Sequence, residues 1–507
     1  MAAQEQGRFS LNIAQTRAGI YDRNMRLLVN NQNRVVASVL PTPQAMAELY
    51  RVLPEDERHA VLERMRGGLP FAMELPTFDV YAVGIDVFEV PRRYGSTQLA
   101  PHVIGYLSDE GRGGAAGIER AFDGVLREKG AVVTARYHLD AAGRTMHGGG
   151  VEIHRQNISG AGGVVLTIDA NIQHIAQRAL AAGAERGAAV VMDVSSGDIL
   201  AMASVPAFDQ NDIAASLDSL DSPFINRATS GYSIGSVFKT VIAAAALESG
   251  FSVRRTYDCR GYIDVGGQIF RCNNIHGVVD MSRALGVSCN PYFISLGLQL
   301  DPDFLLALCR HLGMDASVEL APGMFSGRGN LPSSAELSNP AALANFSFGQ
   351  GSSLATPLQI AGIMSTFAGD GSSVTPRLVK GLTENGINLS QSAPRFAGRS
   401  VLSPQTVGAV QSLMIDSIEQ GSGWPAMPAY GGAGGKTSSA QTGQWITGDD
   451  EEREVIHAWF GGFYPARSPR YSIVVFVEGG ESGELAAAPI FKDIADGIYG
   501  LSLQYSH

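Results

Sequence analysis

The stretch Gly235-Ser236-Val237-Phe238-Lys239-Thr240 opens the most apolar helix that the sequence predicts, which continues through 241–247 towards a C-cap at Gly250. Ser236 and Lys239 are three residues apart, so on a helix their side chains lie on one face, within hydrogen-bonding reach. The unpaired N–H groups and the positive dipole end of a helix N-terminus favour negative charge at Ser236. The pair therefore has the form of a nucleophile beside a base.

Lys239 is the more informative member of this pair. Its apolar neighbours predict partial burial, which disfavours the ammonium form and lowers the pKa towards that of a general base. The 38 lysine and arginine residues include few lysines, which are Lys129, Lys239, Lys380, Lys436 and Lys492. A lysine in an arginine-rich sequence indicates a site that needs an amine able to lose its proton. The structural alternative is a helix cap at Ser236 and a lysine that reaches solvent.

Composition limits the class of protein. With 507 residues the chain is expected to form two or more domains, and 45% hydrophobic and 17% charged residues are typical of a folded globular protein. A net charge of −11 and the lack of a basic run argue against a nucleic-acid partner. The sequence holds no run of 18 apolar residues and no signal peptide, so we expect either a soluble protein or one whose membrane segment has been removed.

Metals and nucleotides are not expected as cofactors. Cys259 and Cys272 flank a predicted hairpin at 261–270, where they form either a disulfide or two packed thiols. Because the sequence has neither a CxxC nor an HExxH motif, we predict no metal site. A glycine-rich run precedes Lys436 and Thr437, but a phosphate loop requires glycine where Tyr430 stands. We therefore expect no nucleotide and no other cofactor.

The elements predict two regions of different character. Residues 1–160 form an irregular region with two amphipathic helices at 43–53 and 54–67, and it ends in glycine-rich stretches at 148–150 and 160–163. After it, a helix at 170–185 precedes a hairpin, and helices fill most of 281–370. The predicted strands of this second region are 188–193, 198–204, 436–439, 455–460 and 471–477, and a last helix follows at 488–499. Strands at both ends with helices between them favour an antiparallel sheet flanked by helices.

Two further short motifs follow Ser236. Ser288-Cys289-Asn290 precedes an apolar helix and alone is typical of a helix-terminal capping pair, and Lys436-Thr437-Ser438 follows much later in the chain. Together the three motifs resemble those of the penicilloyl-serine transferases, S-x-x-K, S-D-N and K-T-G. Further stretches resemble class B penicillin-binding proteins, and these are 17–24, 102–106, 117–123, 166–169, 348–351, 356–359 and 457–463. The likeness spans residue 17 to about residue 495.

This resemblance implies an α+β fold with two domains. Residues 161–507 would form a transpeptidase domain like the serine β-lactamases, with a five-stranded antiparallel sheet flanked by helices, and residues 1–160 a non-catalytic pedestal. It also implies a peptidoglycan D,D-transpeptidase that cross-links stem peptides through a serine acyl-enzyme and is inhibited covalently by β-lactams.

The resemblance assigns roles to the motif residues. Ser236 would attack the carbonyl between two terminal D-alanines, and Lys239 would take its proton. Ser288, held by hydrogen bonds to Lys239 and Lys436, would pass a proton to the departing D-alanine. Asn290 would bond a substrate amide, Lys436 would supply positive charge near the substrate carboxylate, and the hydroxyl of Thr437 would bond that carboxylate. The backbone N–H groups of Ser236 and Ser439 would form the oxyanion hole.

Ser438 departs from the family pattern. The family usually has glycine at the third position of K-T-G, on a strand that binds the substrate peptide by adding it as a further strand. A side chain there would point towards or behind the nucleophile, so that it crowds the pocket or tilts the strand. We therefore expect Ser438 to contribute to substrate binding and to weaken acylation by bulky β-lactams.

The resemblance also implies partners and a location. The pedestal lacks a recognisable glycosyltransferase half, so a polytopic membrane glycan polymerase is the expected partner. Family members carry one N-terminal transmembrane helix before the stretch at 17–24; we attribute its absence to truncation and expect the native protein on the outer face of the cytoplasmic membrane. The alternatives are a D,D-carboxypeptidase, a β-lactamase, for which no E-x-x-x-N motif lies at a plausible position, or a weakly catalytic sensor that activates a partner polymerase.

Overall fold

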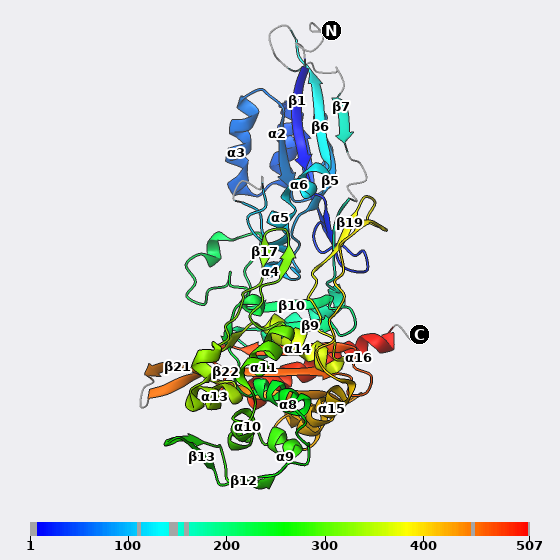
Figure 1. Ribbon diagram of the computed structural model, residues 1–507. Helices are drawn as coiled ribbons and strands as arrows, with labels where there is room; N and C mark the ends of the chain where they lie inside the picture. Colours follow the sequence, from blue (N-terminus) through cyan, green and yellow to red (C-terminus); the bar gives the residue numbers. More distant parts are fainter. Residues whose placement is uncertain are drawn as a thin grey trace. The chain divides into compact units, whose positions relative to one another are not determined.

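The computed structural model describes residues 8–108, 113–140, 145, 151–156, 162–447 and 452–504 (Figure 1). They divide into two compact units, the first formed by 1–98, 122–166 and 380–393, and the second by 99–121, 167–379 and 394–507. The chain thus passes between the units several times. The predicted boundary between residues 160 and 161 and the glycine-rich stretch at 148–150 lie outside the described residues.

The described part of the first unit contains three small sheets and the helices α2, α3 and α6 (Asp123–Glu128). Two sheets are antiparallel, with the orders β1-β6-β7 and β4-β3-β5, and the third, β2-β8-β19-β20, contains the parallel pair β2 and β8. The strands are β1 Arg8–Gln15, β2 Gly19–Tyr21, β3 Gln32–Val39, β4 Phe71–Leu75, β5 Ile85–Arg92, β6 Val132–His138, β7 Val151–Gln156, β8 Gly163–Leu166, β19 Val379–Thr383 and β20 Leu389–Ser392.

Helices α2 (Pro43–Val52) and α3 (Glu55–Arg66) confirm the two helices predicted in this unit. Thr42 caps α2 by accepting a 3.0 Å hydrogen bond from the N–H of Ala45, and acidic residues occupy the first turn of α3. Leu49 and other apolar residues of both helices pack against strand β3. This packing forms one of the cores of the unit.

The second unit contains a five-stranded antiparallel sheet with the order β10-β9-β23-β22-β21, as expected. The strands are β9 Gly187–Asp193, β10 Ile199–Val205, β21 Gly434–Thr447, β22 Glu452–Tyr464 and β23 Tyr471–Val477. Residues on both faces of β9 and β23 are buried, because helices cover the sheet from both sides. Strand β21 is an edge strand, so one of its two sides has no neighbouring strand in this sheet.

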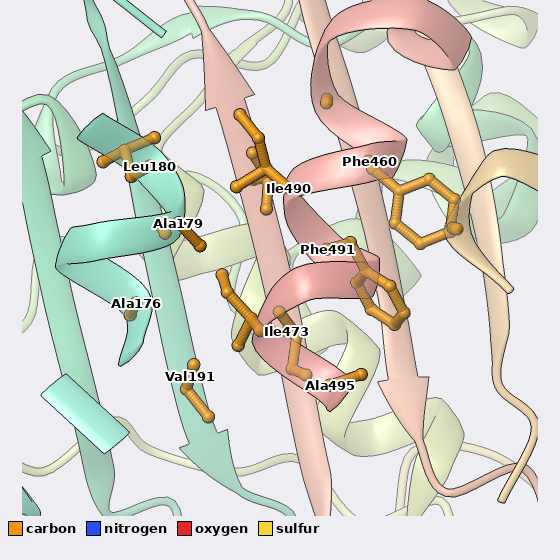
Figure 2. Packing of buried hydrophobic residues seen from close by; sticks show 14 of the residues in the cluster. Ala176, Ala179, Leu180, Val191, Phe460, Ile473, Ile490, Phe491 and Ala495 are labelled. Atoms are coloured by element: carbon orange, nitrogen blue, oxygen red, sulfur yellow. The ribbon is translucent and has the colours of Figure 1, made fainter. Parts of the chain in front are cut away.

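Helices α7 (Ala170–Gly183) and α16 (Ala488–Gln504) pack on one face of this sheet. Figure 2 shows Leu180 of α7 and Phe491 of α16 among the side chains that meet Val191 and Ile473 of the sheet. Helix α14 (Pro357–Ala368) lies on the opposite face, where Gly461 of β22 lies beside its side chains. The sheet and its two helical layers form the core that carries the site.

Helix α8 (Lys239–Glu248) is apolar around most of its circumference because other helices surround it. The remaining helices of the unit include α9 Met281–Gly286, α10 Asn290–Gly297, α11 Pro302–His311, α13 Pro340–Ser347 and α15 Pro404–Glu419. Within the described ranges, no single helix is long and apolar enough to cross a membrane. Helices α10 and α11, which are bent by 108° relative to each other, reach that length and apolarity only when they are taken together.

Candidate active site

Ser236 lies in a tight 3₁₀ turn, Gly235–Phe238, and the α-helix itself begins only at Lys239. Gly235 has φ +64°, and a Cβ at this position would lie 2.3 Å from the hydroxyl of Ser438. The N–H of Gly235 donates to the carbonyl of Gly349 at 2.9 Å. Gly349 has φ +81°, and a Cβ there would lie 2.0 Å from the carbonyl oxygen of Gly235. The turn that presents Ser236 therefore depends on two glycines that are far apart in the sequence.

Lys239 is completely buried and connects the first motif to the second. Its Nζ donates to the carbonyl oxygen of Ser288 at 2.7 Å, to Ser288 Oγ at 3.0 Å and to Asn290 Oδ1 at 2.6 Å. Burial lowers the pKa of Lys239 to about 7. The lowered pKa confirms the direction that the sequence predicted for Lys239. The expected direct hydrogen bond between Lys239 Nζ and Ser236 Oγ, however, is not among the hydrogen bonds of the described residues.

The second motif occupies the short connection between α9 and α10. Ser288 has φ +55°, an uncommon conformation for a residue with a side chain, and Cys289 is the N-cap residue of α10. Asn290 begins the helix, and its Nδ2 donates to the carbonyl of Arg271 at 3.1 Å. The motif is thus held from two sides, by Lys239 and by the segment around Arg271.

The third motif lies on the edge strand β21. Lys436 is completely buried, and its Nζ donates to the carbonyl oxygen and to the Oγ1 of Thr437, at 3.0 and 3.1 Å. Burial and the nearby charge of Lys239 lower the pKa of Lys436 well below its ordinary value. The expected bond from Lys436 to Ser288 is not among the hydrogen bonds of Lys436 with the described residues, which both go to Thr437.

Ser438 and Ser439 point to opposite sides of this strand. Ser438 is 2% exposed, and its Oγ donates to the carbonyl of Ile234 at 2.9 Å, beneath the turn that carries Ser236. Ser439 is exposed, and its Oγ accepts a 3.2 Å hydrogen bond from the N–H of Gly483. Of the two predicted directions, the Ser438 side chain takes the one behind Ser236, where it supports the turn Gly235–Phe238.

Ser422 is a polar residue of the site that motif reasoning missed. It follows α15, its N–H donates to the carbonyl of Gly286 at 3.0 Å, and its Oγ lies 2.9 Å from Thr437 Oγ1. The segment thus joins the helix before the second motif to the third motif. Its sequence signal is the Gly421-Ser422-Gly423 triplet, which is too common to identify a site without the fold.

Trp459 on strand β22 holds the segment that precedes Ser236. The side chain is completely buried, and its Nε1 donates to the carbonyl of Ser233 at 2.9 Å, just before the turn Gly235–Phe238. The ring of Phe476 on β23 contacts both Trp459 and Tyr232, with ring centroids at 4.7 and 4.1 Å. The segment that leads to Ser236 is therefore anchored directly on the sheet.

All four cysteines are free thiols, which settles the alternatives for Cys259 and Cys272 in favour of packed thiols. Cys259, Cys272 and Cys289 gather with His276 beside the second motif. Cys309 is buried in α11 and is not part of this group.

The chain is similar to known proteins over most of its length. The model of a family described as the penicillin-binding protein transpeptidase domain matches residues 187–496. The peptidoglycan D,D-transpeptidase PbpA of Mycolicibacterium smegmatis is 29% identical to the chain, over 90% of the chain and 94% of PbpA. The penicillin-binding protein PbpB of the same organism is 30% identical, over 80% of the chain and 64% of PbpB.

Solved structures share the fold. One belongs to a study titled "Structural coordination of polymerization and crosslinking by a peptidoglycan synthase complex"; its TM-score is 0.71 and its identity 25%, over 97% of this chain and 92% of that chain. Another, penicillin-binding protein A of M. tuberculosis as a penicillin G acyl-enzyme complex, has a TM-score of 0.68 and 23% identity, over 96% of this chain and 100% of that chain.

The chain combines a Ser-x-x-Lys turn, a Ser-x-Asn connection and an antiparallel sheet whose edge strand carries Lys-Thr. These features define the class of the penicilloyl-serine transferases. Within that class, this chain belongs to the penicillin-binding protein transpeptidase family, as a class B member.

Proposed function

We propose that this chain is a peptidoglycan D,D-transpeptidase that cross-links stem peptides through an acyl-enzyme on Ser236, and that β-lactams acylate the same serine. The relatives named D,D-transpeptidases support the reaction class. The observation that carries the proposal is the environment of Lys239, a completely buried amine with a pKa of about 7 that bonds both polar residues of the second motif.

The contacts of Lys239 suggest a route for the proton. An ammonium has three N–H donors, and the second motif takes all three, so the lysine acts as a base only in its neutral form. Ser236 Oγ forms the bond to the carbonyl carbon while its proton goes to Lys239. Ser288 passes a proton to the departing amine as the C–N bond to the terminal D-alanine breaks, and Lys239 returns to Ser288 the proton that it took from Ser236. An amine of a neighbouring stem then attacks the ester carbonyl and gives up a proton to Lys239. The C–O bond to Ser236 breaks as this proton passes to Ser236 Oγ.

The edge strand supports substrate binding. An extended peptide adds to β21 as a sixth strand, and the carboxylate at its end meets Lys436 and Thr437. Because burial disfavours the charged form of Lys436, an anionic substrate favours its protonation and gains a charge-assisted hydrogen bond. Asn290 uses one N–H for Arg271, which leaves its second N–H for a substrate carbonyl.

The backbone N–H groups of Ser236 and Ser439 are our candidates for the oxyanion hole. Ser236 stands in the first turn before α8, where N–H groups lack partners within the helix, and Ser439 is exposed on the edge strand. Such donors stabilise the negative charge of the tetrahedral intermediate. We assign Ser438 a supporting role beneath Ser236 rather than a substrate contact.

The variant Ser438→Gly tests this supporting role. It removes the hydrogen bond to Ile234, which is worth about 0.5–1.5 kcal/mol, so we expect a lower melting temperature and slower acylation by small and bulky β-lactams alike. Second-order acylation rates with one β-lactam of each kind measure the effect. A selective increase with the bulky drug alone would show instead that Ser438 crowds the pocket.

Acylation is expected to accelerate as the pH rises through about 7. The folded-state pKa of Lys239 is lowered to about 7, so below this pH most molecules carry an ammonium that cannot accept the proton of Ser236. The charged and titratable groups that act on Lys239 are Lys436, Cys272 and Cys289. Stopped-flow acylation rates between pH 5 and 9 measure the inflection, and a rate constant that is flat across pH 7 would exclude Lys239 as the base.

Intact-mass spectrometry after incubation with penicillin tests the function itself. We expect a stable adduct of one drug per chain, which maps to the peptide that contains Ser236. Rapid turnover of the drug without an adduct would indicate a β-lactamase, and a folded protein that forms no adduct would indicate a non-catalytic binding protein. Formation of cross-linked dimers from a pentapeptide donor and an amine acceptor separates a transpeptidase from a D,D-carboxypeptidase.

We further propose that the native protein acts at the cytoplasmic membrane with a polytopic glycan polymerase. The neighbouring structure whose title names a peptidoglycan synthase complex supports such a partnership. Polymerisation of a lipid-linked precursor by a purified polymerase, measured with and without this chain, tests the partnership. An unchanged rate, together with no complex in detergent, would contradict it.

A further inference from the structure

Four side chains that can bind a metal gather beside the second motif. Cys259 ends strand β12 (Tyr257–Cys259), Cys272 follows β14 (Gln268–Arg271), His276 precedes β15 (Gly277–Val279), and Cys289 caps α10. Their ligand atoms all lie within 4.8 Å of one another. Cys259 and Cys289 are completely buried, whereas the other two are partly exposed, so the group is enclosed on one side and accessible on the other.

The distances suit a tetrahedral ion. With Zn–S bonds of about 2.3 Å and Zn–N bonds of about 2.0 Å, the ligand atoms of a tetrahedral site lie roughly 3.5–3.8 Å apart. His276 Nδ1 lies 3.6 Å from Cys259 Sγ and 3.6 Å from Cys272 Sγ. A disulfide needs sulfur atoms about 2.0 Å apart, and all cysteines here are free. Three sulfur ligands and one imidazole favour Zn²⁺ over the harder cations, which prefer oxygen.

The segments that supply the ligands also carry the second motif. Cys289 belongs to this motif and is the N-cap residue of α10. Cys272 follows Arg271, whose carbonyl accepts a 3.1 Å hydrogen bond from Asn290 Nδ2. A metal bound by these segments and their local fold would therefore depend on each other.

We propose that these four side chains bind one Zn²⁺, which fixes the segment carrying Ser288 and Asn290 beside Lys239. Cys289 stands between the two polar residues of the second motif, so a bond from its sulfur to zinc restrains both neighbours. The backbone of Ser288 adopts φ +55°, a conformation that such a restraint helps to hold. The search for CxxC and HExxH missed the group, because its ligands come from three separate segments, one of which carries both Cys272 and His276.

Metal content tests the site directly. The full chain, expressed with zinc in the medium and dialysed exhaustively, is expected to hold about one zinc per chain by plasma mass spectrometry. Cys259→Ser and His276→Ala are expected to hold less than about a tenth of that amount. Cys309→Ala is the matched control, because it removes the one cysteine outside the group and is expected to retain the zinc.

A second measurement covers variants that fail to fold. Cobalt added to metal-free wild-type protein is expected to produce thiolate-to-cobalt charge-transfer bands and the intense visible bands of a tetrahedral site. Natively folded wild-type protein that binds neither zinc nor cobalt would overturn the proposal. A disulfide between any two cysteines of the group, found by non-reducing peptide mapping of freshly isolated protein, would also overturn it.

Hydrogen exchange tests the effect on the second motif. Removal of zinc by a chelator is expected to increase amide exchange at 284–292 and to leave β9 and β10 unchanged, and added zinc is expected to reverse the effect. Unchanged exchange at 284–292 would contradict the positioning role. Only the last readout rests on the proposed function: chelation is expected to slow penicillin acylation at least tenfold. Metal content and exchange need no substrate, so a failure of the proposed function is distinguishable from a failure of this site.

Discussion

Replacement of Lys239 by arginine is expected to lower the second-order rate of penicillin acylation by about 10²–10⁴. Arginine keeps the positive charge but does not deprotonate in proteins, so the base would be lost while the donors to Ser288 and Asn290 are in part retained. Stopped-flow acylation with a chromogenic β-lactam measures the rate. Lys239→Met, which removes the amine altogether, is expected to lose as much or more.

Two reference variants make this result interpretable. Ser236→Ala sets the floor, because it has no nucleophile and is expected to form no adduct. Lys492→Arg is the matched control at a partly exposed lysine, whose Nζ lies 2.8 Å from Asp496, and it is expected to react at the wild-type rate. An arginine at position 239 that retains acylation within tenfold, in a natively folded variant, would show that another group takes the proton.

Replacement of Gly349 by alanine is expected to destabilise the protein by about 2–5 kcal/mol and to abolish most acylation. The backbone at Gly349 has φ +81°, which strains an alanine, and the new Cβ would lie 2.0 Å from the carbonyl oxygen of Gly235. Both the turn that carries Ser236 and its hydrogen bond to Gly349 would have to move. Urea unfolding measures the stability, and the penicillin adduct measures the nucleophile.

Gly351 provides the matched control for the steric part of this effect. It also has a positive φ, +93°, but a Cβ there would meet only Asn345 Cβ, at 3.8 Å. Gly351→Ala is therefore expected to cost only the backbone strain, about 1–3 kcal/mol, and to keep the nucleophile turn. Equal losses of acylation in the two variants would show that the contact with Gly235 does not matter.

The regular elements of the second unit were accessible from the sequence because local periodicity determines them. The strand predicted at 471–477 has the same bounds in β23, and the hairpin predicted at 188–204 is β9 and β10. The strand predicted at 436–439 is far longer in β21, Gly434–Thr447, because pairing with β22 extends it through residues of low strand propensity. Tertiary pairing, rather than local preference, sets that length.

The first turn of the central helix was predicted less well. The sequence indicated an α-helix from Gly235, whereas the structure has a 3₁₀ turn followed by α8. Contacts with Gly349 and Ser438, both remote in the sequence, hold that turn. Local propensity carries no information on such contacts, so the displacement of Ser236 from the helix proper was not predictable.

The sequence by itself determined the family, because Ser236 and Lys239, with the two later motifs, are local patterns whose order is typical of it, and the chemistry that we propose rests on these residues. Only the tertiary structure decided where Lys239 Nζ points, that Ser438 lies beneath Ser236, and that three cysteines and a histidine meet beside the second motif. Those outcomes depend on strand register and on loop conformations that bring distant segments within a few ångströms of each other. The direction of each side chain follows from that packing rather than from any short stretch of sequence.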